Sequence, residues 1–185
     1  MSIVLHGVAA GKGIAIGHAH LITRGTTEVP QYDIDPDKLD AEVARFDNAI
    51  KATRKELEQL RGAIPENAPT ELGAFISLHL MLLTDVTLSR EPIDILREQK
   101  INAEWALKLQ SDKLAAQFDS IDDDYLRERK QDMLQVVRRI HNNLVGQSNE
   151  INLAGNLFDD TVLIAHDLSP ADTVLFKEQH ITAFV

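Results

Sequence analysis

Apolar residues recur with helical spacing through the middle of the chain, from about residue 33 to residue 146. A first long helix is predicted after Asp35-Pro36-Asp37, because Asp35 is a suitable N-cap and Pro36 loses no donor in the first turn. Its apolar or small positions follow alternating steps of four and three residues, at Leu39, Val43, Phe46, Ile50, Thr53, Leu57 and Leu60. Nearly the same seam returns at Leu126, Met133, Val137, Ile140 and Leu144. The two matched seams predict long antiparallel helices that pack together.

Three shorter helices are predicted between the long ones, at roughly 70–83, 86–99 and 103–118. Asn102 is a plausible N-cap for the last of them, and residues 62–69 form a loop after the first long helix. We therefore expect a bundle of four to five helices.

Both ends of the chain have a strand-like pattern. Ile14-Ala15-Ile16 and the apolar residues up to Ile22, punctuated by glycines, predict one or two strands with turns. Near the other end, an apolar strand at 161–165, a helix beginning at Ser169-Pro170 and a strand at 181–185 form a strand–helix–strand unit. Strands joined in this way are normally parallel and buried on both faces.

The expected fold class is therefore α/β plus all-α, with an α/β domain interrupted by an inserted helical bundle. The boundaries fall at 1–32 and 147–185 for the α/β domain and at 33–146 for the bundle. The chain ends inside an apolar strand with no polar tail, so we expect it to be an engineered fragment.

Charge narrows the choice of partner. The 185 residues include 29 acidic and 19 basic side chains, for a net charge of −10, which argues against nucleic acid and favours a basic protein partner or simple solubility. The chain has no cysteine, which removes disulfides and thiolate chemistry and fits a reducing compartment. No stretch approaches the ~18 apolar residues of a membrane span, so we expect a cytoplasmic protein that does not enter a membrane.

The candidate chemical motifs have simpler explanations. The glycines from Gly7 to Gly13 lack the spacing and the Ser or Thr of a phosphate-binding loop, so they are interpreted as strand turns. The acidic run before Tyr125 lacks the alternating ligands of a calcium loop and fits the capping of a helix. His18 and His20 share one strand face, but two ligands do not make a metal site. We expect no metal site and no nucleotide site.

The segment from Leu72 to Leu88 is apolar around the whole helix rather than along one stripe. Such a helix is either fully buried or has a face meant for another protein, and the residues alone leave both readings open. Glu71, His79 and Asp85 border the apolar run, and an acidic rim would suit a partner with a basic rim.

Four segments together carry a resemblance to a known family. They are G-I-A-x-G-x-A at 13–19, H-x-M-L-L-x-D at 79–85, D-D-x-Y-L-x-E-R at 122–129 and D-L-[ST]-P-x-x-T at 167–173. In this order they resemble Enzyme I of the bacterial sugar phosphotransferase system, the phosphoenolpyruvate–protein phosphotransferase. Any one of them alone would be weak evidence.

The resemblance implies that the whole enzyme takes phosphate from phosphoenolpyruvate onto a histidine, with Mg²⁺, and passes it to a histidine of the carrier HPr during sugar uptake. It implies that 1–32 and 147–185 form an incomplete phosphohistidine (swivelling) domain and that 33–146 binds HPr. The family's T-S-H-T motif follows the strand that 181–185 would match, and the phosphoenolpyruvate and Mg²⁺ sites belong to a C-terminal barrel. We therefore expect an inactive, cofactor-free and monomeric fragment of a homodimeric enzyme, with no catalytic residue among its seven histidines.

The resemblance also implies a docking surface for the carrier. By position it comprises Glu71, Ala74, Phe75, His79, Met81, Leu82, Asp85, Leu88, Phe118, Leu126 and Arg129. This sequence has Thr70, Ser77 and Thr87 where many members carry acids, which should slow electrostatically steered association. It also has Gly11-Lys12 where the family has Ser-Pro before the opening glycine.

Two alternatives stay open. One is a paralogue that shares the module, such as the nitrogen-regulatory Enzyme I or the dihydroxyacetone kinase phosphotransfer subunit. The other is a helical adaptor that binds a partner and never relays phosphate.

Overall fold

The structure is a computed structural model that describes residues 7–8, 13–22, 29–65, 68–147, 160–165 and 181–185, with only the backbone described at 124–128. The helices of this part are a 3-10 turn, η1 Pro36–Lys38, followed by α1 Leu39–Gly62, α2 Thr70–Leu82, α3 Val86–Ser89, α4 Glu91–Gln99, α5 Ala103–Asp119 and α6 Asp124–Leu144. All of them lie between the first and second strands of the sheet in chain order.

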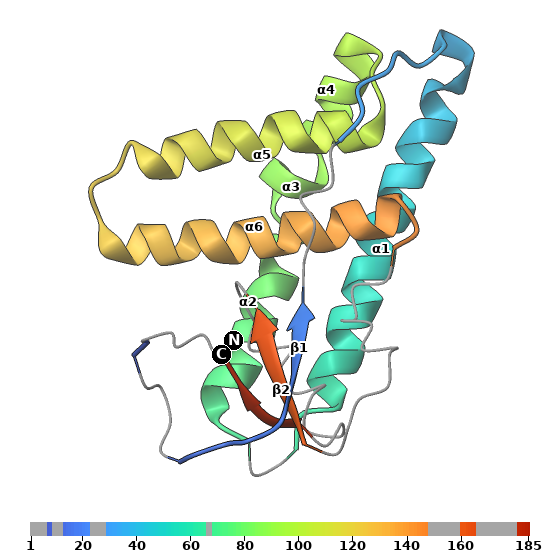
Figure 1. Cartoon of the computed structure of the whole chain (residues 1–185). Coiled ribbons are helices and arrows are strands. Elements are labelled where there is room, and N and C mark those ends of the chain that lie inside the picture. Colours follow the sequence, from blue (N-terminus) through green and yellow to red (C-terminus); the bar gives the residue numbers. More distant parts are fainter. Residues whose placement is uncertain (1–6, 9–12, 23–28, 66–67, 148–159, 166–180) are drawn as a thin grey trace, which may run out of the picture.

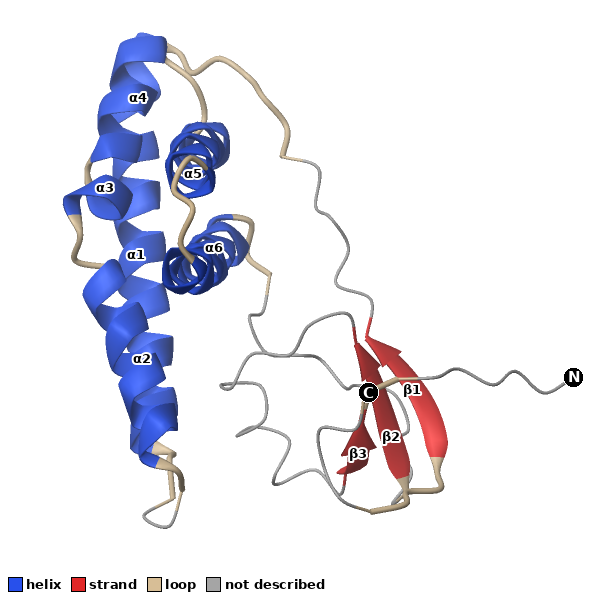
Figure 2. Ribbon diagram, turned by 90° about the vertical axis from the view of Figure 1, so that its left-hand side faces the viewer, coloured by secondary structure: helices blue, strands red, loops and turns tan. Residues whose placement is uncertain are grey.

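The helices form two layers that cross each other. α1 to α4 make one layer, while α5 and α6 run side by side in opposite directions and cross α1 steeply (Figures 1 and 2). The prediction that the two long helices pack antiparallel is therefore wrong, although α1 and α6 do contact each other. The short link at 120–123 makes α5 the antiparallel neighbour of α6. Across this link, Lys130 Nζ donates to both carboxylate oxygens of Asp119 at 2.7 Å.

The seam residues of the two long helices meet in one core. On α1 the buried positions include Phe46, Thr53 and Leu57, as the heptad pattern predicts. On α6, Met133 and Ile140 are buried as predicted, but Val136 rather than Val137 is completely enclosed. This small rotation follows from the crossing, because α6 also presents one side to α2 and α5.

The predicted helix at 86–99 is broken at Arg90 into α3 and α4. Pro92 explains the break, since proline has no N–H to donate and its ring clashes with the carbonyl four residues earlier, at Leu88. Two predicted caps also differ. Asp35 pairs with Lys38 instead of capping, and Asn102 occupies the N-cap position of α5 without a side-chain cap bond.

The three strands form one parallel sheet. β1 His18–Ile22 pairs with β2 Thr161–Ala165, which pairs with β3 Ile181–Phe184, so β2 is central. The predicted parallel pairing is confirmed, and the sheet lies apart from the helices in Figure 2. Burial on both faces is not found in the described part of the central strand, because Leu163 is enclosed but Ile164, on the opposite face, is 37% exposed. The helix predicted from Ser169 lies outside the described residues.

One glycine of the opening motif is required by close packing. The Asp160 carbonyl accepts a hydrogen bond from the His18 N–H at 2.9 Å, and a Cβ on Gly17 would collide with that same carbonyl oxygen. The sequence predicted turns for these glycines, but Gly17 instead lets two chain segments approach each other at the start of the sheet.

Across the ranges that the structure describes, no single helix is both long and apolar enough to cross a membrane; α2 together with Val86–Gln99 reaches that length only as a pair bent by 60°.

Candidate partner-docking surface

α2 has two apolar faces with different environments. Ile76, His79, Leu80 and Leu83 recur at helical spacing and are buried against the rest of the bundle. On the other side, Met81 is 61% exposed and Ala74 is exposed, although both belong to the same apolar run. The all-round apolar pattern therefore combines an inner core face with an outer face open to solvent.

The outer face forms a continuous stripe. We use the name α2 stripe for Glu71, Ala74, Phe75, Leu78, Met81, Leu82 and Asp85, which follow one another at steps that keep them on one side of the helix and its C-terminal turn. Glu71 and Asp85 are exposed at its two ends, while Phe75, Leu78 and Leu82 are half-buried between them. The stripe thus has an apolar centre and a carboxylate at each end.

Asp85 is held in place by the start of α3. Its Oδ1 accepts a hydrogen bond from the Thr87 N–H at 2.8 Å and another from the Thr87 hydroxyl at 2.7 Å. A side chain that caps a helix in this way has a fixed direction. Asp85 therefore presents its charge at a defined corner between α2 and α3.

Two other predicted residues come from the α5–α6 pair. Phe118 is half-buried in the last turn of α5, where it packs against the bundle core. Arg129 donates from Nη1 to Asp132 Oδ2 at 3.2 Å, and Asp132 Oδ1 lies 4.0 Å from His79 Nε2 on α2. The structure therefore brings Arg129 close to the inner face of α2. Leu126 belongs to α6, but its side chain is outside the described part.

His79 and Leu88 do not belong to an accessible surface, and the prediction is corrected for both. The His79 side chain is fully buried, with its ring 4.1 Å from the Phe75 ring between centroids. Burial, with a further contribution from the positive charge of Arg139, lowers the pKa of His79 from 6.5 to about 4. The ring is thus neutral at physiological pH and packs against the Phe75 ring from the core side. Leu88 is part of the core because it lies on the side of α3 that faces the bundle, opposite the exposed Val86.

The other predicted residues whose side chains are described keep some accessible surface: Glu71, Ala74, Met81 and Asp85 are exposed, and Phe75, Leu82, Phe118 and Arg129 are intermediate. The prediction omitted Leu78 and the exposed Val86. Leu78 could have been found from its spacing, four residues after Ala74 and three before Met81.

Within the described ranges, no group of three or more His, Cys, Asp or Glu side chains is arranged to hold a metal ion. His18 Nδ1 lies 3.0 Å from Asp160 Oδ1 at an exposed position of the sheet, while His6, His166 and His180 are outside the described residues.

Comparisons with known proteins give matches along nearly the whole chain. Residues 6–129 match the family model described as PEP-utilising enzyme, N-terminal. The chain is 42% identical over 192 residues to a phosphoenolpyruvate-protein phosphotransferase of Cupriavidus necator, covering all of this chain and 33% of that protein. It is 32% identical over 184 residues to the Bacillus subtilis protein of the same name, covering 97% of this chain and 31% of that protein. The chain therefore spans about a third of the length of these relatives.

Two solved structures are similar in fold. An NMR solution structure of Enzyme I (nEIt) superposes with a TM-score of 0.78 at 32% identity, covering 96% of this chain and 71% of that one. The N-terminal domain of Enzyme 1 - Nitrogen superposes with a TM-score of 0.64 at 24% identity, covering 93% of this chain and 69% of that one, which supports the fold alone.

Proposed function

Because the chain belongs to the family of PEP-utilising enzymes, as their N-terminal part, we propose that it is the carrier-docking portion of a phosphoenolpyruvate–protein phosphotransferase. The whole enzyme would move a phosphoryl group from phosphoenolpyruvate to one of its own histidines and then to a histidine of an HPr-type carrier. In the last step the P–N bond to the enzyme histidine breaks as a P–N bond to the carrier histidine forms. Residues 33–146 would dock the carrier, and 1–32 with 147–185 would form part of the phosphohistidine domain.

The exposed apolar centre of the α2 stripe is the observation that carries this proposal. Met81 has a large apolar side chain that the rest of the described chain leaves mostly in water, beside the partly exposed Phe75 and Leu82. Burying such side chains against a partner stabilises a complex at about 25 cal/mol per Å² of apolar surface. A stripe of one helix offers a limited area, which suits a relay that must bind and release its carrier quickly.

Charge adds orientation to this contact. Glu71 and Asp85 at the two ends of the stripe favour a carrier with basic groups around an apolar centre, and this complementarity speeds encounter more than it strengthens binding. With few acids on the rim, the apolar centre should account for most of the affinity.

We assign no step through Mg²⁺ or phosphoenolpyruvate to these residues; across the part of the chain that the structure describes, no group of three or more His, Cys, Asp or Glu side chains is arranged to hold a metal ion. The role of this chain is to bind and orient the carrier. The proposed enzyme works in the cytoplasm, and a chain without cysteine is compatible with that reducing compartment.

The proposal is tested by titrating the ¹⁵N-labelled chain with an HPr-type carrier and following amide chemical shifts. We expect the shift changes to concentrate at the α2 stripe and its α3 corner, and Met81→Glu to weaken binding about tenfold or more by placing a charge in the apolar centre. Val145→Glu, at an exposed apolar site beyond the end of α6, is the matched control and should bind like the unmodified chain. Shift changes that avoid the stripe, or equal binding by both variants, would contradict the proposal.

A further inference from the structure

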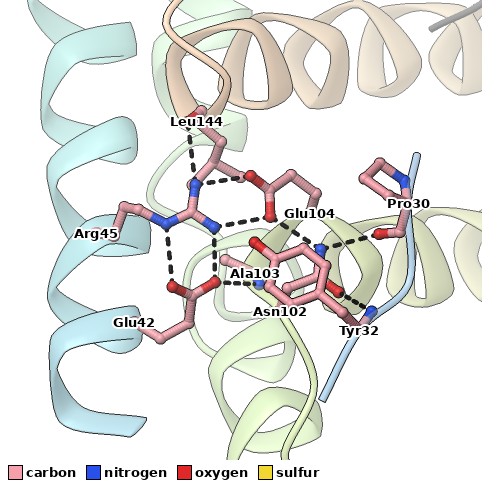
Figure 3. A network of polar contacts seen from close by, with 8 residues as sticks. All are labelled: Pro30, Tyr32, Glu42, Arg45, Asn102, Ala103, Glu104 and Leu144. Atoms are coloured by element: carbon pink, nitrogen blue, oxygen red, sulfur yellow. Dashed lines mark hydrogen bonds and ion pairs between the residues drawn. The ribbon is translucent and has the colours of Figure 1, made fainter. Parts of the chain in front are cut away.

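A polar cluster joins the two points where the chain enters and leaves the helical part. We use the name crossover cluster for Glu42, Arg45, Asn102 and Glu104, shown in Figure 3 with their backbone partners. The chain arrives from β1 through residues 30–32 and leaves for β2 after Leu144, the last residue of α6. Both segments are bonded to this one cluster.

Arg45 uses its complete set of donors here. Its Nη1 donates to Glu104 Oε1 at 2.6 Å and to the Leu144 carbonyl at 3.0 Å. Its Nη2 donates to Glu104 Oε2 at 2.7 Å and to Glu42 Oε1 at 2.6 Å, and Nε donates to Glu42 Oε2 at 3.0 Å. A guanidinium has five N–H donors, so every one of them has an acceptor. Lysine could not reproduce this planar fork.

The two carboxylates extend the cluster to the entering segment. Glu42 Oε1 also accepts the Ala103 N–H at 2.7 Å, at the start of α5. Glu104 Oε2 also accepts from Asn102 Nδ2 at 3.0 Å. Asn102 in turn donates to the Pro30 carbonyl at 3.0 Å and accepts the Tyr32 N–H at 3.1 Å.

Burial makes these hydrogen bonds hard to replace with bonds to water. Asn102 is fully buried and Glu104 is 6% exposed, so neither can exchange its partners freely for water. Burial of Glu104 opposes its charged form, but hydrogen bonds from Arg45 and Asn102 prevail and lower its pKa to about 2. Glu104 therefore stays ionised beside the Arg45 guanidinium across physiological pH.

We propose that Arg45 is a positioning residue for phosphoryl transfer, because it fastens the entering and leaving segments to each other and to the bundle. The inference rests on the proposed function. Along the chain, the helical part is joined to the sheet at these two crossings, since β1 precedes the helices and β2 follows them. With both crossings fixed at one point, the helices present a docked carrier to the sheet from a narrow range of directions.

Loss of the cluster would detach the leaving segment at Leu144 from the entering segment, which backbone bonds at Tyr32 and Ile34 still hold against the bundle. The tether between the docking surface and β2 would then lengthen. The carrier would still bind, because the α2 stripe is on a different helix and keeps its own core contacts. Its histidine would meet the enzyme histidine less often in a productive direction, which lowers the rate of transfer without weakening docking.

The test uses the full-length phosphotransferase that contains this chain and measures steady-state transfer to an HPr-type carrier. For Arg45→Met we expect kcat to fall about tenfold while KM for the carrier stays within about twofold. Asn102→Ala removes the side-chain bonds to Pro30 and Tyr32 but leaves the bonds of Arg45 and the backbone bonds at Tyr32 and Ile34, so its loss of kcat should be smaller. Arg97→Met, which breaks the exposed pair with Asp40, and Ile140→Val, which loosens the core, are the controls for charge and for stability.

The outcomes separate clearly. Unchanged kcat in both cluster variants, with an active unmodified enzyme, would overturn the inference alone, as would an equal loss in Ile140→Val. If Arg45→Met does not fold, Asn102→Ala and Arg45→Lys decide by the same split between kcat and KM. An unmodified enzyme that transfers no phosphate to any HPr-type carrier would overturn the proposed function, and this inference with it.

Discussion

Replacing Glu104 by glutamine should make the unfolding free energy of the helical part less sensitive to acid. The pKa of this carboxyl is lowered from 4.5 to about 2, since burial, which would raise it, is outweighed by hydrogen bonds from Arg45 and Asn102. The folded pKa is below the unfolded one, so the unfolded chain binds more protons as the pH falls. The stabilisation is therefore complete above about pH 4.5 and is lost as the pH falls towards 2.

The magnitude follows from the size of the shift. Full protonation removes about 3 kcal/mol of unfolding free energy, and about 2 kcal/mol of it is already lost near pH 3. The Glu104 side chain is only 7% exposed, so solvent screens this contribution little. At pH 7 the Glu104→Gln variant should be less stable than the unmodified chain by roughly 2–3 kcal/mol, because Arg45 loses a charged partner. Near pH 3 the difference should shrink to about 1 kcal/mol or less.

Urea unfolding followed by far-UV circular dichroism, at pH 7 and near pH 3, measures this change. Other carboxylates titrate in both proteins and cancel when the two unfolding free energies are subtracted. Glu58→Gln, at an exposed position of α1, is the matched control and should differ from the unmodified chain by no more than about 0.5 kcal/mol at either pH. A difference for Glu104→Gln that is equal at both pH values would refute the reasoning.

Two further substitutions test other parts of the fold. Burial and Arg139 lower the pKa of His79 to about 4, so the stabilisation from its neutral form is complete above pH 6.5, and about 2 kcal/mol of unfolding free energy is lost near pH 5. His79→Leu should reduce that loss in the same urea experiment, and an unchanged pH dependence would contradict this expectation. Gly17→Ala should push the Asp160 carbonyl away and weaken the pairing of β1 with β2, which faster amide hydrogen exchange in β2 would report. The control is Gly62→Ala, where a Cβ meets nothing within 4 Å, and it should leave exchange in β2 unchanged.

The helices were largely predictable because their signals are local. The seam from Leu39 to Leu60 predicted α1, and the loop at 62–69 falls between α1 and α2 as expected. The parallel sheet could also be predicted, from the strand–helix–strand pattern near the end. The break at Arg90 has a local signal too, Pro92, which the apolar spacing obscured.

The arrangement of the helices and the burial of individual side chains could not be predicted in this way. A helix that is apolar all round does not reveal which side the bundle covers. The resemblance places His79 and Leu88 on the docking surface by position alone, and both are in the core. Arg45 and Glu104 are 59 residues apart, and no pattern in either segment indicates that they meet. The crossover cluster was missed for that reason, and only its i,i+3 pair of Glu42 and Arg45 has a local signature.

The pairing of His18 with Thr161 has a consequence for how the chain folds. Direct pairing in an unfolded chain would close a loop of more than a hundred residues. If the helices form first and Arg45 gathers residues 30–32 and Leu144, only roughly 30 residues remain to be closed, which lowers the entropic cost by about 1 kcal/mol. We expect the strands to pair last, after the folded helices have brought residues 30–32 and Leu144 close together.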